Sequence, residues 1–216
     1  MPQQARADAT RRSIIEAAAE MFAATGYANT NLDDIIVRAA ISKGALYFHF
    51  TSKEGLARAV IDEQHAKAMA GCRNLLDSPL PPLESLISIS SQFVAQLLTS
   101  PLARAGARLT AEIGETHGMV TDYHQEWLAL VAALAERAIT TGDMLPGVNS
   151  DDFANFLVAA FDGIRFWSIH ANGSEDLAAR TERLWIFLLP SIVHPSDLGF
   201  FREYIHRLWL SQFTHC

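Results

Sequence analysis

Hydrogen-bond donors and positive charges gather in residues 42–53, where several side chains could contact phosphate. These side chains are Ser42, Lys43, Tyr47, His49 and Lys53. Gly44 and Ala45 lie among them and have almost no side chain, so the backbone could approach a large ligand closely. A lysine can reach a guanine edge or a phosphate oxygen, and tyrosine and histidine can donate to phosphate. These residue types in one short segment indicate contact with double-stranded DNA.

The local charge favours this interpretation although the whole chain is acidic. The 216 residues carry a net charge of -7. Residues 1–53 hold six Lys or Arg and five Asp or Glu, whereas the remainder holds eleven and nineteen. After Asp34 no acidic residue occurs until Glu54, and the interval contains three basic residues. This segment therefore predicts a surface that meets DNA, while the acidic remainder would be repelled by it.

Capping residues predict the helices that present these side chains. Asn31 can cap a helix that ends near Ala40, because Asp34 follows three positions later in a capping-box-like arrangement. Ser42 can cap a very short helix, and Ser52 can cap the next one, which begins at Lys53. Two helices joined by a tight turn are typical of a helix-turn-helix, whose second helix enters the major groove.

Within this unit, some aromatic and aliphatic residues are expected to face inward. We expect Leu46, Phe48 and Phe50 to pack the helices together. Taken singly, each residue of the segment is more often an ordinary core or surface residue. The combination is what indicates a DNA-binding unit.

Helical periodicity continues through almost the whole chain, and no run alternates convincingly as a strand. We predict an all-α fold with a three-helix DNA-binding domain at 1–52 and a larger ligand-binding and dimerisation domain at 53–216. The expected helices cover residues 8–25, 31–40, 43–48, 53–77, 83–99, 101–114, 120–141, 151–171, 174–189 and 196–213. The clearest break, Ser78 to Pro82, contains three prolines.

Other classes of protein lack support in the sequence. Cys72 and Cys216 have no metal-type spacing, and the scattered histidines form no ligand pair. No apolar run approaches the roughly 18 residues that span a bilayer, and the polar N-terminus has no signal core. We therefore expect a cytoplasmic protein with no membrane contact, no metal and no cofactor.

The N-terminal motif resembles the TetR family of bacterial transcriptional regulators. The matching residues are Gly26-Tyr27, Thr30, the run KGALYFHF from Lys43 and the run SKEGL from Ser52. The resemblance implies an all-helical dimer that represses transcription from a palindromic operator until a small ligand binds. It implies phosphate or base contacts at Thr30, Lys43, Gly44, Tyr47, His49 and Lys53. The family often has glycine in the turn, where this chain has Ala40.

Within that family the chain is similar to receptors for γ-butyrolactone-type signals. The similarity lies in residues 103–109, in Trp127 and in the segment Gly142 to Pro146. Such relatives place a tryptophan in the ligand cavity, and Trp127 matches that position. A lactone or butenolide needs mostly apolar walls with one or two donors. The other expected lining residues are Gln64, which offers an amide, and Phe93, Leu97, Leu109, Val131 and Phe161.

The helices expected at 151–171 and 174–189 are apolar nearly all round, so each should be buried on more than one side. A two-fold helix-pair interface in a homodimer would explain this, and Trp167 and Trp185 are candidates for it. Burial inside one monomer is the alternative.

Two other functions remain possible on the sequence alone. An all-helical enzyme could use the cavity, although no nucleophile–base–acid set is present and Asp162 is the one odd ionisable residue on its apolar helix. A DNA-binding regulator that has lost its ligand response is the other. We predict a repressor that is not an enzyme.

Overall fold

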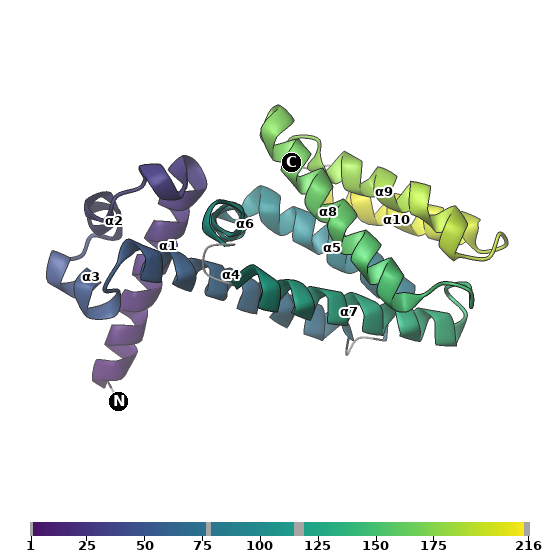
Figure 1. Ribbon diagram of the computed structural model, residues 1–216, viewed down its shortest axis with the longest axis horizontal. Helices are drawn as coiled ribbons and strands as arrows, with labels where there is room; N and C mark the ends of the chain where they lie inside the picture. Colours follow the sequence, from purple (N-terminus) through teal and green to yellow (C-terminus); the bar gives the residue numbers. More distant parts are fainter. Residues whose placement is uncertain (1, 77–78, 115–118, 214–216) are drawn as a thin grey trace. The chain divides into compact units, whose positions relative to one another are not determined.

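The computed structural model describes residues 2–76, 79–114 and 119–213, and every regular element in them is an α-helix. The helices are α1 (Pro2–Asn29), α2 (Leu32–Ala39), α3 (Lys43–His49), α4 (Lys53–Leu76), α5 (Pro82–Thr99), α6 (Pro101–Ile113), α7 (Met119–Thr141), α8 (Ser150–Asn172), α9 (Leu177–Ile192) and α10 (Leu198–Phe213), as labelled in Figure 1. The predicted all-α fold is confirmed.

These helices form two compact units. The first comprises residues 1–69 and 99–122, and the second comprises 70–98 and 123–216. Helix α6 therefore groups with α1 to α3 and the first part of α4. The boundaries of these compact units thus differ from the domain boundary predicted at residue 52. That boundary between a DNA-binding and a ligand-binding domain stays a prediction.

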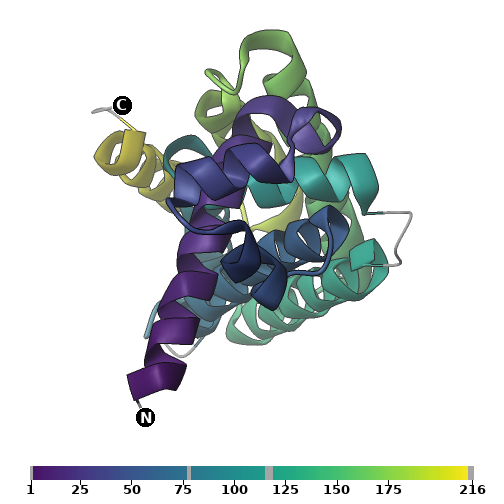
Figure 2. The same ribbon diagram turned by 90° about the vertical axis from the view of Figure 1, so that its left-hand side faces the viewer.

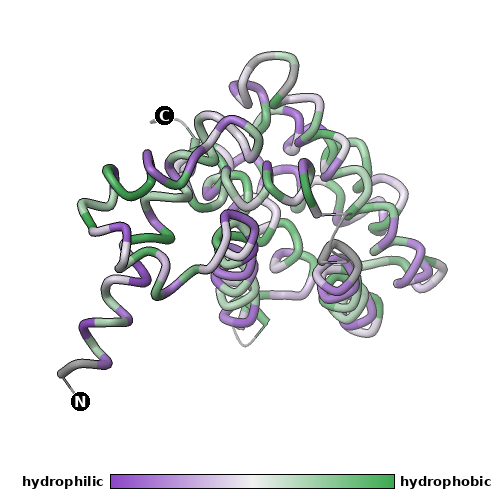
Figure 3. Tube along the Cα trace, turned by 60° about the vertical axis from the view of Figure 1, so that its left-hand side comes forward, coloured by the Kyte–Doolittle hydropathy of each residue, from purple (hydrophilic) through white to green (hydrophobic). Residues whose placement is uncertain are grey.

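In the first unit, α1 packs along α6 and also contacts α2 and α3 (Figure 2). The inward face of α1 carries Ile14, Ala18 and Phe22, which are fully buried, as the helical period predicts. Hydrophobic and hydrophilic residues are interspersed along the helices (Figure 3). Leu46 of α3 completes this core.

The cap residues predicted for the helix-turn-helix are confirmed. The side chain of Asn31 accepts a hydrogen bond from the Asp34 amide at 2.8 Å, and that of Ser42 accepts from the Ala45 amide at 3.2 Å. Ser52 likewise accepts from the Gly55 amide at 3.0 Å. The caps satisfy amides that the first helical turn leaves without partners.

Ala40 ends α2 in the left-handed conformation, with φ 53° and ψ 44°. An L-residue with a Cβ is strained there, and glycine is not. Ala40→Gly should therefore raise the free energy of unfolding by about 0.5–1 kcal/mol, measured by urea denaturation. The control is Ala39→Gly, one residue earlier inside α2, which should lower stability by about 1 kcal/mol because glycine weakens a helix. Equal losses for both variants would contradict the strain at Ala40.

Helix α1 and two later boundaries differ from the sequence predictions. Helix α1 is bent at Gly26, where φ is 81°, and resumes to Asn29 instead of ending at Thr25. Helix α8 begins at Ser150, one residue before the predicted start at residue 151, and Asn149 caps it, with its side chain accepting from the Asp152 amide at 2.9 Å. Helix α9 begins at Leu177, and it continues two residues past Pro190 although the proline has no N–H for the helical hydrogen bond.

In the second unit, α9 packs against both α8 and α10 (Figure 1). Trp185 of α9 is fully buried, and its indole Nε1 donates to the Ser90 hydroxyl of α5 at 2.7 Å. Trp209 of α10 donates to the Ala178 carbonyl of α9 at 2.8 Å. Two indole donors thus tie α9 to its neighbours.

Among the described residues, no single helix has the length and apolar character needed to cross a membrane. Helices α5 and α6 reach the length and hydropathy of a membrane span only when they are taken together.

Candidate DNA-binding surface and ligand cavity

Helix α3 turns its polar and small residues outward. Ser42, Lys43, Gly44 and Tyr47 are exposed, and His49 is half-buried. Leu46 is fully buried and anchors the opposite side of this short helix. A Cβ built on Gly44 would meet nothing closer than the Ser42 hydroxyl at 4.0 Å, so the backbone there lies open to a partner.

Phe48 corrects the sequence-based assignment of the core. We expected it to pack inward with Leu46 and Phe50, but 79% of its surface is exposed. Leu46 and Phe50 are four residues apart and share a helical face, whereas Phe48 lies two residues from each and points elsewhere. The helical period was the signal that could have identified Phe48 as a surface residue.

Lys43 is exposed and already ion-paired across the turn. Its ammonium donates to a carboxylate oxygen of Asp33, at the start of α2, at 3.2 Å. This hydrogen bond, and then the charge of Asp33, raises the pKa of Lys43. The ammonium is therefore charged at any physiological pH, and Asp33 uses one of its three donors.

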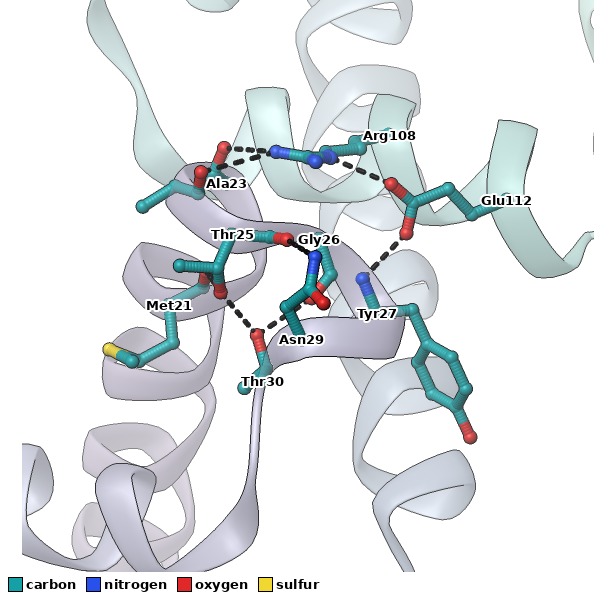
Figure 4. A network of polar contacts seen from close by, with 10 residues as sticks. Met21, Ala23, Thr25, Gly26, Tyr27, Asn29, Thr30, Arg108 and Glu112 are labelled. Atoms are coloured by element: carbon teal, nitrogen blue, oxygen red, sulfur yellow. Dashed lines mark hydrogen bonds and ion pairs between the residues drawn. The ribbon is translucent and has the colours of Figure 1, made fainter.

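Thr30 differs from the other predicted DNA contacts because it is buried, with only 2% of its surface exposed. Its hydroxyl donates to the Gly26 carbonyl at 2.7 Å and lies 2.8 Å from the Thr25 hydroxyl (Figure 4). Thr30 thus holds the turn between α1 and α2. A direct contact with DNA stays a prediction from the motif.

Lys53, the first residue of α4, is half-buried and belongs to the first unit. Its ammonium lies 4.5 Å from the centroid of the Tyr27 ring and donates to the Ala28 carbonyl at 3.3 Å. The ammonium is therefore held at the end of α1.

A cavity of about 110 Å³ lies within the second unit, between helices α5, α7, α8 and α9. Its wall contains Leu86, Ile89, Ser90, Phe93, His124, Trp127, Val131, Leu157, Val158, Phe161, Asp162, Leu184 and Trp185. Most of these side chains are apolar, as a site for a small hydrophobic molecule requires.

An aromatic cluster forms part of this wall. The Phe93 ring packs edge-on against two other rings. Its centroid lies 5.5 Å from that of Trp127 and 5.4 Å from that of Phe161. Edge-to-face packing fixes the orientation of the three rings. Four of the residues predicted to bind the ligand therefore line this cavity, namely Phe93, Trp127, Val131 and Phe161.

Three other predicted lining residues lie outside this wall. Leu97 is buried in α5 but does not line the cavity. Gln64 and Leu109 belong to the first unit, where the Gln64 side chain packs against Gly106 and Leu109 is fully buried. A ligand contact for any of the three stays a prediction.

The polar groups of the wall are few, and sequence reasoning did not assign them to it. The Ser90 hydroxyl accepts from Trp185 and donates to the Ile87 carbonyl at 2.8 Å. Asp162 accepts from Arg165 of the same helix at 3.2 Å, and His124 is half-buried. Asp162 had been noted from the sequence as an odd ionisable residue on an apolar helix, and it lies in the cavity wall.

No group of His, Cys, Asp and Glu side chains in the described parts of the chain is arranged to hold a metal ion. Cys72 is buried, and burial raises the pKa of its thiol to about 11. The thiol is thus protonated and unreactive at neutral pH. Cys216 lies outside the described residues, as does Ser78 of the predicted break.

Comparison with known families gives two matches along the chain. Residues 14–60 match bacterial regulatory proteins of the tetR family, and residues 80–194 match the tetracyclin repressor-like C-terminal domain. The first match covers the helix-turn-helix and the start of α4. The second covers all four helices that line the cavity.

Individual relatives agree with these matches. The A-factor receptor protein of Streptomyces griseus is 36% identical over 202 residues, covering 92% of this chain and 69% of the relative. A crystal structure of a gamma-butyrolactone receptor (ArpA-like protein) superposes with a TM-score of 0.82 at 27% identity, covering 95% of this chain and 99% of that one. CprB from Streptomyces coelicolor, in complex with its biological operator sequence, gives a TM-score of 0.82 at 27% identity, covering 94% and 98%.

Proposed function

This chain belongs to the TetR family of bacterial regulatory proteins, and from that premise we propose that it is a ligand-released transcriptional repressor. It binds a palindromic DNA operator as a homodimer, and a small γ-butyrolactone or butenolide releases it. The observation that carries the DNA-binding part is α3, whose polar and small residues face outward while Leu46 anchors it.

Helix α3 suits the role of the recognition helix. A recognition helix presents its N-terminal residues to base edges in the major groove. Here those residues are Ser42, Lys43 and Gly44, all exposed. The small Gly44 allows close approach, and Lys43 provides a charged donor for a guanine edge. Tyr47, His49 and Lys53 would contact the flanking phosphates.

Lys43→Ala should weaken specific operator binding by about 5- to 150-fold per half-site, the range for loss of one good base contact. Binding to unrelated DNA should fall much less, because phosphate contacts elsewhere remain. Titration of both DNAs by fluorescence anisotropy measures the two affinities. Asp33→Ala is the control, because it frees the Lys43 ammonium and removes a negative charge. Equal weakening on both DNAs would assign Lys43 to the phosphate backbone instead.

An exposed apolar surface on α8 and α9 supports the homodimer. Phe156, Phe166 and Trp167 of α8 are each about half exposed or more, and 82% of Phe187 of α9 is exposed. Large exposed apolar patches mark interaction sites. Trp185, also considered for the interface from the sequence, is fully buried inside the second unit. A self-complementary patch gives the two-fold symmetry that a palindromic operator requires.

The cavity of the second unit supports a small, mostly apolar effector. Trp127, Phe93 and Phe161 supply flat hydrophobic surface, and a few polar groups could fix a carbonyl or hydroxyl. The similarity to relatives described as A-factor and gamma-butyrolactone receptors favours a γ-butyrolactone as this effector. Release requires that the ligand bind more tightly to the conformation that cannot hold DNA.

The DNA-binding part is tested by a gel-shift on the DNA upstream of the protein's own gene. We expect a shifted complex at nanomolar protein, and loss of it when either half of the palindrome is scrambled. Equal retardation of the scrambled DNA would contradict sequence-specific binding of this palindrome.

A further inference from the structure

Lys53 is restrained before any DNA is present. Its ammonium lies over the face of the Tyr27 ring, 4.5 Å from the centroid. One of its three donors is used by the Ala28 carbonyl at 3.3 Å, which leaves the others available. A cation over an aromatic face is attracted by the ring quadrupole. The lysine head is therefore held in one place, whereas a free lysine would sample many rotamers.

Tyr27 is itself fixed from two sides. Its ring stacks on Phe22, with centroids 6.1 Å apart and an interplanar angle of 23°, and Phe22 is fully buried. Its backbone amide donates to a carboxylate oxygen of Glu112 in α6 at 2.5 Å. Burial, and then the nearby Glu54 carboxylate, raises the pKa of the phenol, so the ring under Lys53 remains neutral.

Glu112 is in turn held by Arg108, one helical turn earlier in α6 (Figure 4). The Arg108 guanidinium donates to Glu112 at 2.7 Å and to the Ala23 and Ala24 carbonyls at 3.1 and 3.3 Å. These carbonyls can accept from Arg108 because the helical backbone of α1 is interrupted at Gly26, two residues after Ala24.

Gly26 is required for this arrangement. A Cβ at residue 26 would lie 2.6 Å from Arg108 Nη2 and 2.7 Å from Glu112 Oε1, and φ there is 81°. No other residue type fits both the space and the backbone angle. In Figure 4 the Tyr27 ring points away from Arg108 and Glu112, so α6 holds its backbone while its side chain is left to meet Lys53.

We propose that Tyr27 is a positioning residue for DNA binding: its ring holds the Lys53 ammonium where it meets an operator phosphate. The proposal rests on the proposed function, since it assigns Lys53 a phosphate of bound DNA. A pre-positioned lysine loses less rotamer freedom on binding, and a phosphate contact carries no sequence information. Tyr27 therefore raises the affinity for specific and unrelated DNA alike.

The test is a double-mutant cycle on DNA affinity with the variants Tyr27→Leu, Lys53→Ala and their combination. Tyr27→Leu should weaken binding about 2- to 10-fold on both DNAs. In the Lys53→Ala background it should have no further effect, because there is no ammonium left to position. Tyr27→Phe keeps the ring and should bind like the wild type. Tyr27→Met is a second non-aromatic variant if leucine impairs folding.

The salt dependence of binding separates positioning from contact. Lys53→Ala should reduce the slope of log K against log salt by about two, because the homodimer loses one phosphate contact in each subunit. Tyr27→Leu should leave the slope unchanged, because the contact still forms at a greater entropic cost. Lys67→Ala is the matched control, since Lys67 is an exposed lysine of the same helix that pairs with Glu63. It should change neither affinity nor slope.

Several outcomes would overturn the proposal. Equal weakening by Tyr27→Leu with and without Lys53 would mean that the ring only supports the fold of the unit. Wild-type affinity and slope in Lys53→Ala would show that Lys53 meets no phosphate, while operator binding itself would stand. Failure of the wild-type protein to bind any DNA would remove the proposed function and this proposal together.

Discussion

Trp167→Glu and Phe187→Glu should each yield a monomer that binds the palindromic operator at least about 100-fold more weakly than the wild type. These two side chains are 64% and 82% exposed, on α8 and α9, which pack against each other. Aromatic anchors at the centre of an interface contribute most of the binding energy, and a buried unpaired carboxylate adds a further cost. Sedimentation velocity measures the mass, and anisotropy measures operator affinity.

The loss of operator affinity follows from the symmetry of the complex. Two recognition helices in one dimer enter successive major grooves about 34–36 Å apart. Once one half-site is bound, the second binding event is intramolecular and therefore strongly favoured. A monomer loses that advantage although its own α3 is intact.

Phe200→Glu is the matched control for these two variants. Phe200 of α10 is also a large aromatic residue, with 53% of its surface exposed, but it lies outside α8 and α9. It should leave both the dimer and operator binding unchanged. Intact dimers for both Trp167→Glu and Phe187→Glu would place the interface elsewhere.

Trp127→Ala should preserve operator binding and abolish release by the ligand. Its ring contributes a flat part of the cavity wall and packs edge-on against Phe93. Truncation removes contacts that a bound lactone would make, so the ligand concentration for half-release should rise at least about 100-fold. The measurement is a titration of the preformed protein–operator complex with a γ-butyrolactone that carries an alkyl chain.

Trp127→Phe provides the control for that titration. It keeps an aromatic ring in the wall and should shift half-release far less than alanine does. Equal operator affinity of both variants without ligand confirms that the DNA-binding unit is undisturbed. Release of the alanine variant at the wild-type ligand concentration would exclude Trp127 from the ligand site.

Local signals made most of the fold predictable. The caps at Asn31, Ser42 and Ser52 are short-range features, because each side chain bonds an amide three residues away. The periodicity of apolar residues located the helices for the same reason. Where two local signals competed, as with the adjacent Asn149 and Ser150, the prediction missed the boundary by one residue.

The contacts that sequence reasoning missed join residues far apart in the chain. Arg108 bonds the Ala23 carbonyl across 85 residues, and Trp185 bonds Ser90 across 95. Helical periodicity says which side of a helix is buried but not which other helix covers it. That limit also explains why Gln64 and Leu109 were grouped with the cavity residues of the second unit.

The most direct test of the central claim is release of the wild-type protein from its operator by a purified γ-butyrolactone. A complex formed on the upstream palindrome is titrated with the lactone, and anisotropy follows the free DNA. We expect full release once the lactone saturates its site, with the ligand bound stoichiometrically and recovered unchanged. A complex that persists at saturating lactone would contradict ligand-released repression by this class of molecule, and turnover of the lactone would indicate an enzyme.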